Sequence, residues 1–107
     1  MVKYDDGLDG AATALAHRGR RQIISRLGAG SATSSELAEL LDIGLPALHK
    51  HLDLLRRASL IESSKTGRTV SHVLRPAGLD QLADWLLTRK SFWSNQFDAL
   101  ADHLETS

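Results

Sequence analysis

The feature that most constrains the fold is a leucine repeat that runs straight into two β-forming segments. Its members, Leu45, Leu48, Leu52 and Leu55, recur at spacings of three, four and three residues. This period places them on one side of an α-helix, facing a core. The sequence therefore predicts a helix over 45–57, whose outward side carries Pro46, Ala47, His49, Lys50 and Asp53.

The β-forming segments, 60–65 and 69–74, follow this helix without a linker. Thr66-Gly67-Arg68 between them suits a hairpin turn, because glycine tolerates the positive φ that such turns require. We predict a small antiparallel, two-stranded wing over 60–75, with the basic residues Lys65 and Arg68 near its tip.

Another helix is predicted just before the leucine repeat. Thr33 and Glu36 match a capping box, in which each side chain accepts a hydrogen bond from the other residue's backbone N–H. This helix begins near Ser34, and a short turn containing Gly44 separates it from the next one, so that residues 34–57 form a helix-turn-helix. Its buried side is expected to carry Leu37, Leu40 and Leu41.

Helices are also predicted on both flanks of this unit. Arg18–Leu27 suits a helix that is basic on its outer side, and 8–16 suits a short one with one apolar side. From 79 to 104 the apolar residues follow a near-heptad spacing, interrupted at Arg89-Lys90, which predicts one kinked helix or two abutting ones. Trp85 and Leu86 are expected to complete the core.

The remaining apolar side chains of the two end segments exceed what the small central fold can cover. A two-fold dimer would cover them, so 8–16 and 79–104 are the predicted dimerisation helices. The predicted interface consists of Leu8, Ala12, Leu15, Trp93, Phe97, Leu100 and Leu104. The expected fold class is thus mainly α with one small hairpin, a winged helix-turn-helix with dimerisation helices at both termini.

The 107 residues suit a single domain, 1–107. Its formal net charge is zero, but basic and acidic residues are concentrated in different segments of the sequence. Residues 17–75 carry ten basic and five acidic side chains, a net charge of +5. Residues 1–16 and 76–107 carry net charges of −2 and −3. A basic centre between acidic ends is the asymmetry expected when the central face meets phosphates.

Several classes of protein are disfavoured by what the sequence lacks. Without cysteine there can be no disulfide, thiolate metal ligand or cysteine nucleophile. We find no secretory signal and no apolar run of membrane-spanning length, and therefore expect a cytoplasmic protein with no membrane partner. No glycine-rich phosphate loop or catalytic constellation is present, so we predict that the protein is not an enzyme and needs no cofactor.

Several segments together resemble one family. They are Ala14-Leu-Ala-His-Arg-Gly-Arg-Arg-Gln-Ile-Ile-Ser-Arg-Leu, Ser35-Glu-Leu-Ala, Leu45-Pro-Ala-Leu-His-Lys-His-Leu-Asp-Leu-Leu, and Trp85 with Phe92-Trp93. This pattern resembles the ArsR family of bacterial winged-helix repressors over about residues 8–104, and most of all its branch without metal-binding cysteines and with an aromatic-rich final helix. The resemblance implies a dimer that binds a palindromic operator and that an inducer releases.

On this resemblance, His49, Lys50 and His51 occupy the stretch of the recognition helix that reads DNA, and Lys65 and Arg68 belong to a basic wing. The chain departs from the family in three places. His17-Arg18-Gly19 stands where relatives often have Asp-Pro-Thr, His49 where serine is common, and Ser59 where glycine usually precedes the wing. The last departure suggests an altered junction between helix and wing.

We expect further phosphate contacts from Arg20, Arg21 and Thr33. For the arginines, simple solvation or pairing with the acidic flanks is an equal alternative, and Thr33 is mainly a cap. Together these observations predict a sequence-specific, homodimeric repressor that binds double-stranded DNA at an inverted repeat. The operator, the regulated genes and the inducing signal are not legible in the sequence.

Two alternative functions stay open. In one, the chain is a winged-helix module that binds a protein, and the central positive charge is incidental. In the other, it is a metal-responsive repressor that uses His103 and nearby acids. His49 and His51 cannot bind the same metal ion, because side chains two residues apart are separated by about 200° around the helix axis. Near His103 the paired aspartate and histidine spacing of relatives with an interface metal site is missing. We therefore predict no metal site, and the metal-responsive repressor stays the alternative.

Overall fold

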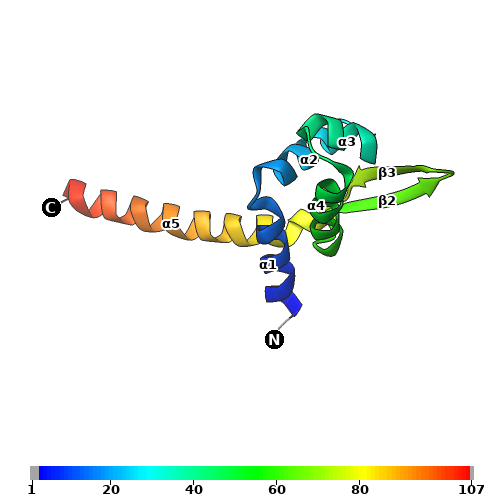
Figure 1. Ribbon diagram of the computed structural model, residues 1–107. Coiled ribbons are helices and arrows are strands. Elements are labelled where there is room, and N and C mark those ends of the chain that lie inside the picture. Colours follow the sequence, from blue (N-terminus) through cyan, green and yellow to red (C-terminus); the bar gives the residue numbers. More distant parts are fainter. Residues whose placement is uncertain (1–2, 107) are drawn as a thin grey trace.

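The order of elements in the computed structural model, which describes residues 3–106, is that of a winged helix-turn-helix (Figure 1). The helix-turn-helix is formed by α3 (Ser34–Leu41) and α4 (Leu45–Arg57) and the wing by β2 (Ile61–Thr66) and β3 (Thr69–Leu74), which confirms the predicted mainly α, winged helix-turn-helix fold. The elements are α1 (Lys3–Leu15), α2 (Arg18–Gly28), β1 (Ala32–Thr33), α3 (Ser34–Leu41), α4 (Leu45–Arg57), β2 (Ile61–Thr66), β3 (Thr69–Leu74), the 3-10 helix η1 (Pro76–Leu79) and α5 (Asp80–Thr106).

The sheet has three strands, in the order β1-β3-β2, so the prediction of a two-stranded hairpin was incomplete. Strand β1 pairs antiparallel with β3, placing Ala32 opposite His72 and Thr33 opposite Ser71. Two residues are too few to show a period, and β1 exists only because folding brings it beside a strand forty residues later in the sequence. It joins the start of α3 to the wing.

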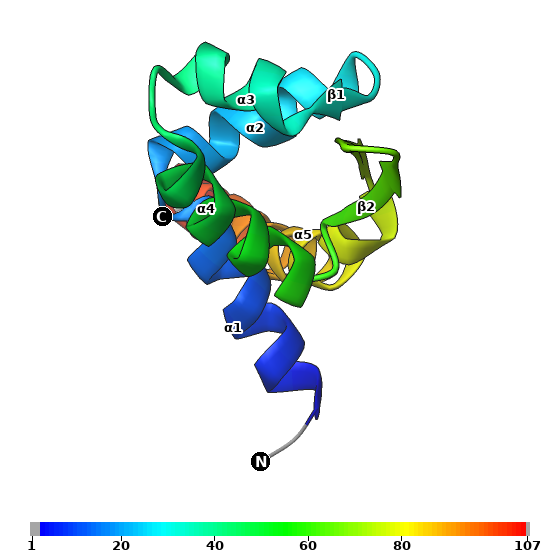
Figure 2. The same cartoon turned by 45° about the vertical axis from the view of Figure 1, so that its right-hand side comes forward.

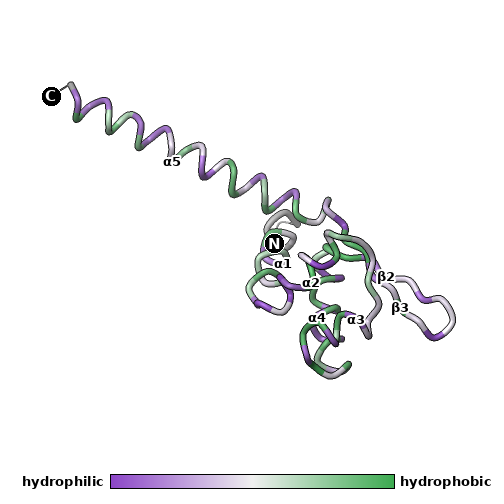
Figure 3. Tube along the Cα trace, turned by 90° about the horizontal axis from the view of Figure 1, so that it is seen from above, coloured by the Kyte–Doolittle hydropathy of each residue, from purple (hydrophilic) through white to green (hydrophobic). Residues whose placement is uncertain are grey.

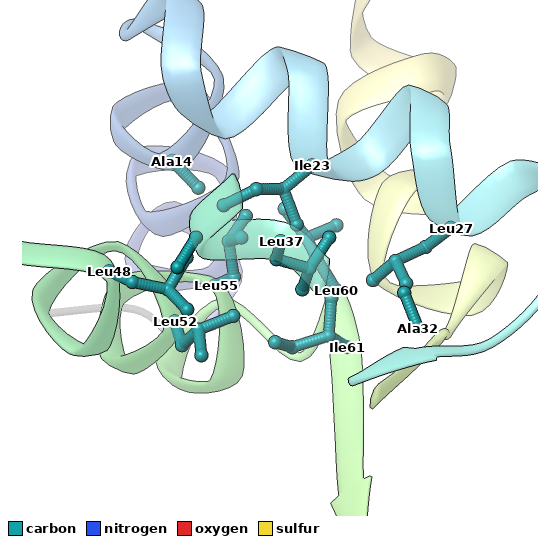
Figure 4. Packing of buried hydrophobic residues seen from close by; sticks show 11 residues of the cluster. Ala14, Ile23, Leu27, Ala32, Leu37, Leu48, Leu52, Leu55, Leu60 and Ile61 are labelled. Carbon is teal, nitrogen blue, oxygen red and sulfur yellow. The ribbon is translucent and has the colours of Figure 1, made fainter. Parts of the chain in front are cut away.

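The core lies between α2, α3, α4 and the base of the sheet (Figure 4). Leu48, Leu52 and Leu55 are buried as the leucine repeat predicted, but Leu45 is 46% exposed and Leu40 is 49% exposed. Leu45 lies at the rim of a groove that faces the wing, and Leu40 borders a shallow surface of α2 that is lined by arginines. The leucine spacing identified which side of α3 and of α4 faces the core. It could not show where along that side the neighbouring elements stop covering the helix.

Helix α1 packs through small residues rather than through its leucines. Ala11 and Ala14 are completely buried, whereas Leu8 and Leu15 are half-buried and Ala12 is exposed. Alanines allow close approach between backbones, and α1 packs against α2, α4 and α5. The apolar side predicted for this helix was therefore displaced by about one residue.

Helix α5 runs unbroken for 27 residues, about 40 Å at 1.5 Å per residue, so the alternative of two abutting helices is wrong. It projects from the body and makes the molecule 70 Å long (Figures 1 and 3). Trp85 is half-buried near the body, with the Arg89 guanidinium 4.9 Å from its ring centroid. Leu86 is 52% exposed, which corrects its expected place in the core. Of the elements within residues 3–106, none lies alongside the far part of α5 (Figure 1).

The junction between α4 and the wing is closed by a Schellman motif. The backbone N–H of Ser59 donates to Arg56, and that of Leu60 donates to Leu55. Ser59 has a φ of 59°, the left-handed conformation in which glycine is usually found. The serine therefore adopts the left-handed backbone that a glycine would adopt. The altered junction expected from this departure stays a prediction.

Candidate nucleic-acid interface

The outward side of α4 is exposed as the helical period predicted. Pro46, Ala47, His49, Lys50 and Asp53 are all exposed, and no neighbouring element covers them. Pro46 stands in the first turn after Gly44, the N-cap residue. Short side chains at the beginning of the helix leave its first turn narrow, which suits entry into a major groove.

A groove of about 400 Å³ separates α4 from the wing and is roofed by the start of α3. Figure 2 shows this arrangement, with α4 and β2 on opposite sides below α3. Ser34, Ser35, His49, Arg68 and Thr69 contribute polar side chains to its lining. Of these, the sequence singled out His49 and Arg68. The serines and Thr69 carry no local signal of a site, because only the fold places three elements around one groove.

His72 ties the three sides of this groove together. The ring is completely buried on β3, with Nε2 2.8 Å from Ser34 Oγ and Nδ1 2.7 Å from Ser63 Oγ. Arg56 on α4 donates to the same Ser63 Oγ at 3.1 Å and pairs with Asp53. One connected network thus joins α3, both wing strands and α4.

Both ring nitrogens of His72 are hydrogen-bonded to hydroxyl groups. The guanidinium of Arg56 can only donate, so the Ser63 oxygen accepts from it. Each hydroxyl has one proton and two lone pairs, so Ser63 and Ser34 can pair with either neutral tautomer of the ring. Burial, followed by the positive charges of Arg56 and His49, lowers the pKa of His72 below its ordinary 6.5. The ring is therefore neutral at neutral pH and serves as a structural link.

The wing ends in the turn that the sequence predicted. Strands β2 and β3 pair from Ile61 with Leu74 to Thr66 with Thr69, leaving Gly67 and Arg68 as the two turn residues. Gly67 has a φ of 61°, which confirms its predicted role. Lys65 and Arg68 are exposed at the tip. Together they place two cations at the wing tip, where Arg68 also lines the groove.

Arg20 and Arg21 of α2 differ in the hydrogen bonds that they make. Arg20 donates through Nε to the Ala14 carbonyl at 2.7 Å and through another nitrogen to the Thr13 carbonyl at 2.9 Å, so it caps the end of α1. Its remaining nitrogen lies 3.2 Å from Nδ1 of His51. This geometry favours a structural role for Arg20 over contact with a phosphate. Arg21 is exposed and donates to the Leu15 carbonyl through one nitrogen.

Thr33 forms the predicted capping box at the start of α3. Its Oγ1 accepts from the Glu36 backbone N–H at 3.1 Å, and the Glu36 carboxylate accepts from the Thr33 N–H at 3.2 Å. The Glu36 carboxylate also accepts from the Thr33 hydroxyl at 3.0 Å. The hydrogen bonds that this carboxylate accepts, from the Thr33 backbone N–H and then from the Thr33 hydroxyl, lower the pKa of Glu36. Thr33 is half-buried and lines the groove, where its main role is that of the cap.

His51 does not join the exposed side of α4. It is half-buried and lies beside His17, the N-cap residue of α2, with ring centroids 4.6 Å apart. His49, by contrast, lines the groove on the wing side. The two α4 histidines therefore face different surfaces, as their spacing predicted.

The far part of α5 carries a continuous apolar face. Trp93, Phe97, Leu100 and Leu104 are between 53% and 65% exposed, and the Trp93 ring contacts those of Phe92 and Phe97. Of the α1 residues predicted to share an interface with them, Leu8 and Leu15 are already half-buried against the body. Among residues 3–106, the exposed apolar surface is therefore concentrated on α5.

Two further expectations concern metals and membranes. Among residues 3–106, no three His, Cys, Asp or Glu side chains gather closely enough to hold a metal ion, so His103 and its acidic neighbours do not form such a group within one chain. In the same range no helix is both long and apolar enough to cross a membrane.

Comparison with known proteins agrees with this architecture. A family model described as "Helix-turn-helix domain" matches residues 15–64. The chain is 33% identical over 98 residues to the HTH-type transcriptional regulator Rv2034 of Mycobacterium tuberculosis, covering 92% of this chain and 89% of that one. It is 29% identical over 68 residues to the transcriptional repressor SdpR of Bacillus subtilis, covering 64% and 76% of the two chains.

Solved structures extend the similarity to the whole fold. An ArsR family transcriptional regulator superposes with a TM-score of 0.80 at 33% identity, covering 88% of this chain and 97% of that one. The ArsR-like transcriptional regulator from Rhodococcus sp. RHA1 gives the same TM-score at 28% identity, covering 95% and 94%. These proteins are transcriptional regulators, a class without enzymatic activity. The chain belongs to the ArsR family of winged helix-turn-helix transcriptional regulators.

Proposed function

We propose that the protein is a homodimeric repressor that binds an inverted-repeat operator through α4 and the wing. The observation that carries this proposal is the exposed side of α4, which presents His49 and Lys50 next to the groove that ends in the basic wing tip. An α-helix fits the major groove of B-DNA, where polar side chains reach base edges and small apolar ones contact thymine methyl groups. Ala47 has the size for the second kind of contact.

The wing and the start of α3 supply contacts to the DNA backbone in this proposal. Lys65 and Arg68 are exposed at the wing tip, and each phosphate that they neutralise releases counterions and makes binding salt-dependent. Thr33 and Arg21 are secondary candidates for the same role. Such contacts position the protein on the duplex, whereas the contacts of α4 to base edges select its sequence.

The apolar face of α5 supports the dimer. A single chain leaves Trp93, Phe97, Leu100 and Leu104 exposed along one side of a projecting helix, and a two-fold partner would bury them. Two copies of α4 would then contact half-sites about 34 Å apart, one turn of DNA. Repression, by occlusion of a promoter, follows the role in the name of the similar SdpR.

The test uses duplexes selected from a random library by the purified protein. The double variant Lys50→Ala, Arg68→Ala should bind the selected duplex about 10- to 100-fold more weakly, since each lost contact costs about 1–3 kcal/mol when it reads a base and less when it meets a phosphate. The matched control Arg89→Ala, Lys90→Ala removes the same two charges from α5. Equal affinity of both double variants, each shown to be folded by circular dichroism, would contradict the proposed interface.

A further inference from the structure

His17 and His51 form a second polar cluster, on the opposite side of α4 from His49. Their ring centroids are 4.6 Å apart with an angle of 49° between the ring planes. Both line a groove of about 300 Å³, whose other walls include Arg18, Gln22 and Leu41. The groove thus lies where the beginning of α2 meets the middle of α4 and the helix-turn-helix turn.

The hydrogen bonds of both rings define their tautomers. Nδ1 of His17 accepts from the Gly19 backbone N–H at 2.9 Å, and Nδ1 of His51 lies 3.2 Å from a guanidinium nitrogen of Arg20. A backbone N–H and a guanidinium only donate, so both Nδ1 atoms are acceptors. Each neutral ring therefore carries its proton on Nε2. Burial, with the charges of His17 and Arg20, lowers the pKa of His51, which keeps that ring neutral at pH 7.

Two Nε2–H groups are donors, and donors suit an oxyanion rather than a metal. A metal ion needs a lone pair on the nitrogen that it binds, and the lone pairs on Nδ1 are already occupied by Gly19 and Arg20. The groove lining adds the cation of Arg18 and contains no carboxylate among the described residues. The local charge and the donor set therefore favour an anion.

We infer that His17 and His51 donate from Nε2 to the oxygens of one phosphate group, with Arg18 as its counter-charge. The occupant is a backbone phosphate of bound DNA, a step that rests on the proposed function. A helix in the major groove lies between two phosphate backbones. The wing tip would meet the backbone on one side of α4, and the histidine pair would meet the backbone on the other. A free phosphate-bearing molecule would present the same chemistry to the same donors.

The variants are chosen to keep the local structure. Asparagine is a good N-cap residue, so His17→Asn retains an oxygen for the Gly19 N–H while removing the Nε2 donor. His51→Asn similarly retains an acceptor for Arg20. His103→Asn on α5 removes a histidine from a distant part of the chain and serves as the matched control.

The first arm titrates the protein alone with inorganic phosphate at constant ionic strength and follows the ring Cε1–H resonances by NMR. The His17 and His51 signals should move together on one binding curve while His103 stays still, and either asparagine variant should abolish the curve. The second arm measures the affinity for several duplexes. The neutral histidines contribute hydrogen bonds rather than charge, so the His17→Asn, His51→Asn variant should bind every duplex several-fold more weakly, with an unchanged preferred sequence. Arg18→Ala removes the counter-charge and should lower the slope of log K against log salt by about one.

The outcomes distinguish a DNA phosphate from a free phosphate compound as the occupant. They also distinguish failure of the anion site from failure of the proposed DNA-binding function. A uniform loss of DNA affinity in the histidine variant, with or without a phosphate titration curve, supports a DNA phosphate in the site. A phosphate curve with unchanged DNA affinity, or in a protein that binds no DNA, supports the anion site but identifies its occupant as a free phosphate compound. If neither arm responds to the variants, or if all histidine signals move alike, the site does not exist.

Discussion

The Nε2 atom of His72 lies 2.8 Å from the Oγ of Ser34, so a buried ring in the wing is tied to the first turn of the helix that precedes the recognition helix. Through its other nitrogen the same ring reaches Ser63, and through Ser63 it reaches Arg56. The relative position of α4 and the wing therefore depends on one neutral imidazole. This dependence makes the geometry of the proposed DNA surface sensitive to pH and to substitution.

We expect the free energy of unfolding to fall as the pH drops below about 6.5. The unfolded chain carries His72 with its ordinary pKa of 6.5, whereas the folded ring has a lowered pKa, so the unfolded state binds protons that the folded state does not. Urea unfolding between pH 7.5 and 5.5 measures the loss, above the range in which carboxylates titrate.

The variant His72→Gln should be less stable by about 1–3 kcal/mol at pH 7.5, because it breaks a buried hydrogen-bonded link. Its stability should also depend less on pH than that of the wild type. His51, whose pKa is lowered too, accounts for the remaining slope. A pH dependence unchanged in His72→Gln but altered in the control His103→Gln would contradict this assignment.

Gly78 is required by close packing rather than by its backbone conformation. A Cβ at this position would lie 2.1 Å from the Ser59 carbonyl oxygen and 3.0 Å from the Leu60 side chain. Gly78→Ala should therefore destabilise the protein by about 1–3 kcal/mol, the usual cost of overpacking. At Gly28 nothing lies within 4 Å of the added carbon. Gly28→Ala should leave the melting temperature equal or higher, and a similar loss in both variants would rule out the clash as the cause.

Ser59→Gly should stabilise the protein. Ser59 has a φ of 59°, which costs a residue with a Cβ about 1–2 kcal/mol and costs glycine nothing. Part of this gain is lost because glycine makes the unfolded chain more flexible, so we expect a net gain of about 0.5–1 kcal/mol. Ser59→Ala retains the Cβ and should show no gain in chemical denaturation. If alanine stabilises as much as glycine, strain at this residue is not the reason.

Phe97→Asp should dissociate the proposed dimer. Phe97 is 65% exposed in the single chain and lies on the apolar face of α5, so an aspartate there would place a charge in the middle of the interface. Ala99, two residues later, is exposed on another side of the helix, and Ala99→Asp is the matched control. Sedimentation at micromolar concentration should show a monomer for the first variant and a dimer for the second. A wild type that sediments as a monomer would contradict the dimer altogether.

The parts of the structure that were predicted correctly depend on neighbours within a few residues. The capping box of Thr33 and Glu36, the positive φ of Gly67 and the buried Leu48, Leu52 and Leu55 follow from hydrogen bonds and periods inside one element. The exposed side of α4 follows from the same period. The individual contacts proposed for Lys50, Arg68 and the dimer interface stay predictions.

The features that were missed depend on what packs against each element. Strand β1 is too short to be recognised without β3, and Leu45 is exposed because α4 begins beyond the core. Arg20 was expected to point toward water or phosphate, yet three of its nitrogens turn to α1 and to His51. No local pattern distinguishes such an arginine from the exposed Arg21.

The sequence by itself determined the order of helices and wing, the side of α4 that is outward and the basic character of the centre, because periodicity, capping and charge act over short distances along the chain. The tertiary structure alone decided that His72 links Ser34 to Ser63 and that His17 meets His51. These partners are separated by up to 38 residues in the sequence. Contacts of that kind arise only when helices and strands pack in three dimensions, which is why the polar surfaces of this protein became visible only in its fold.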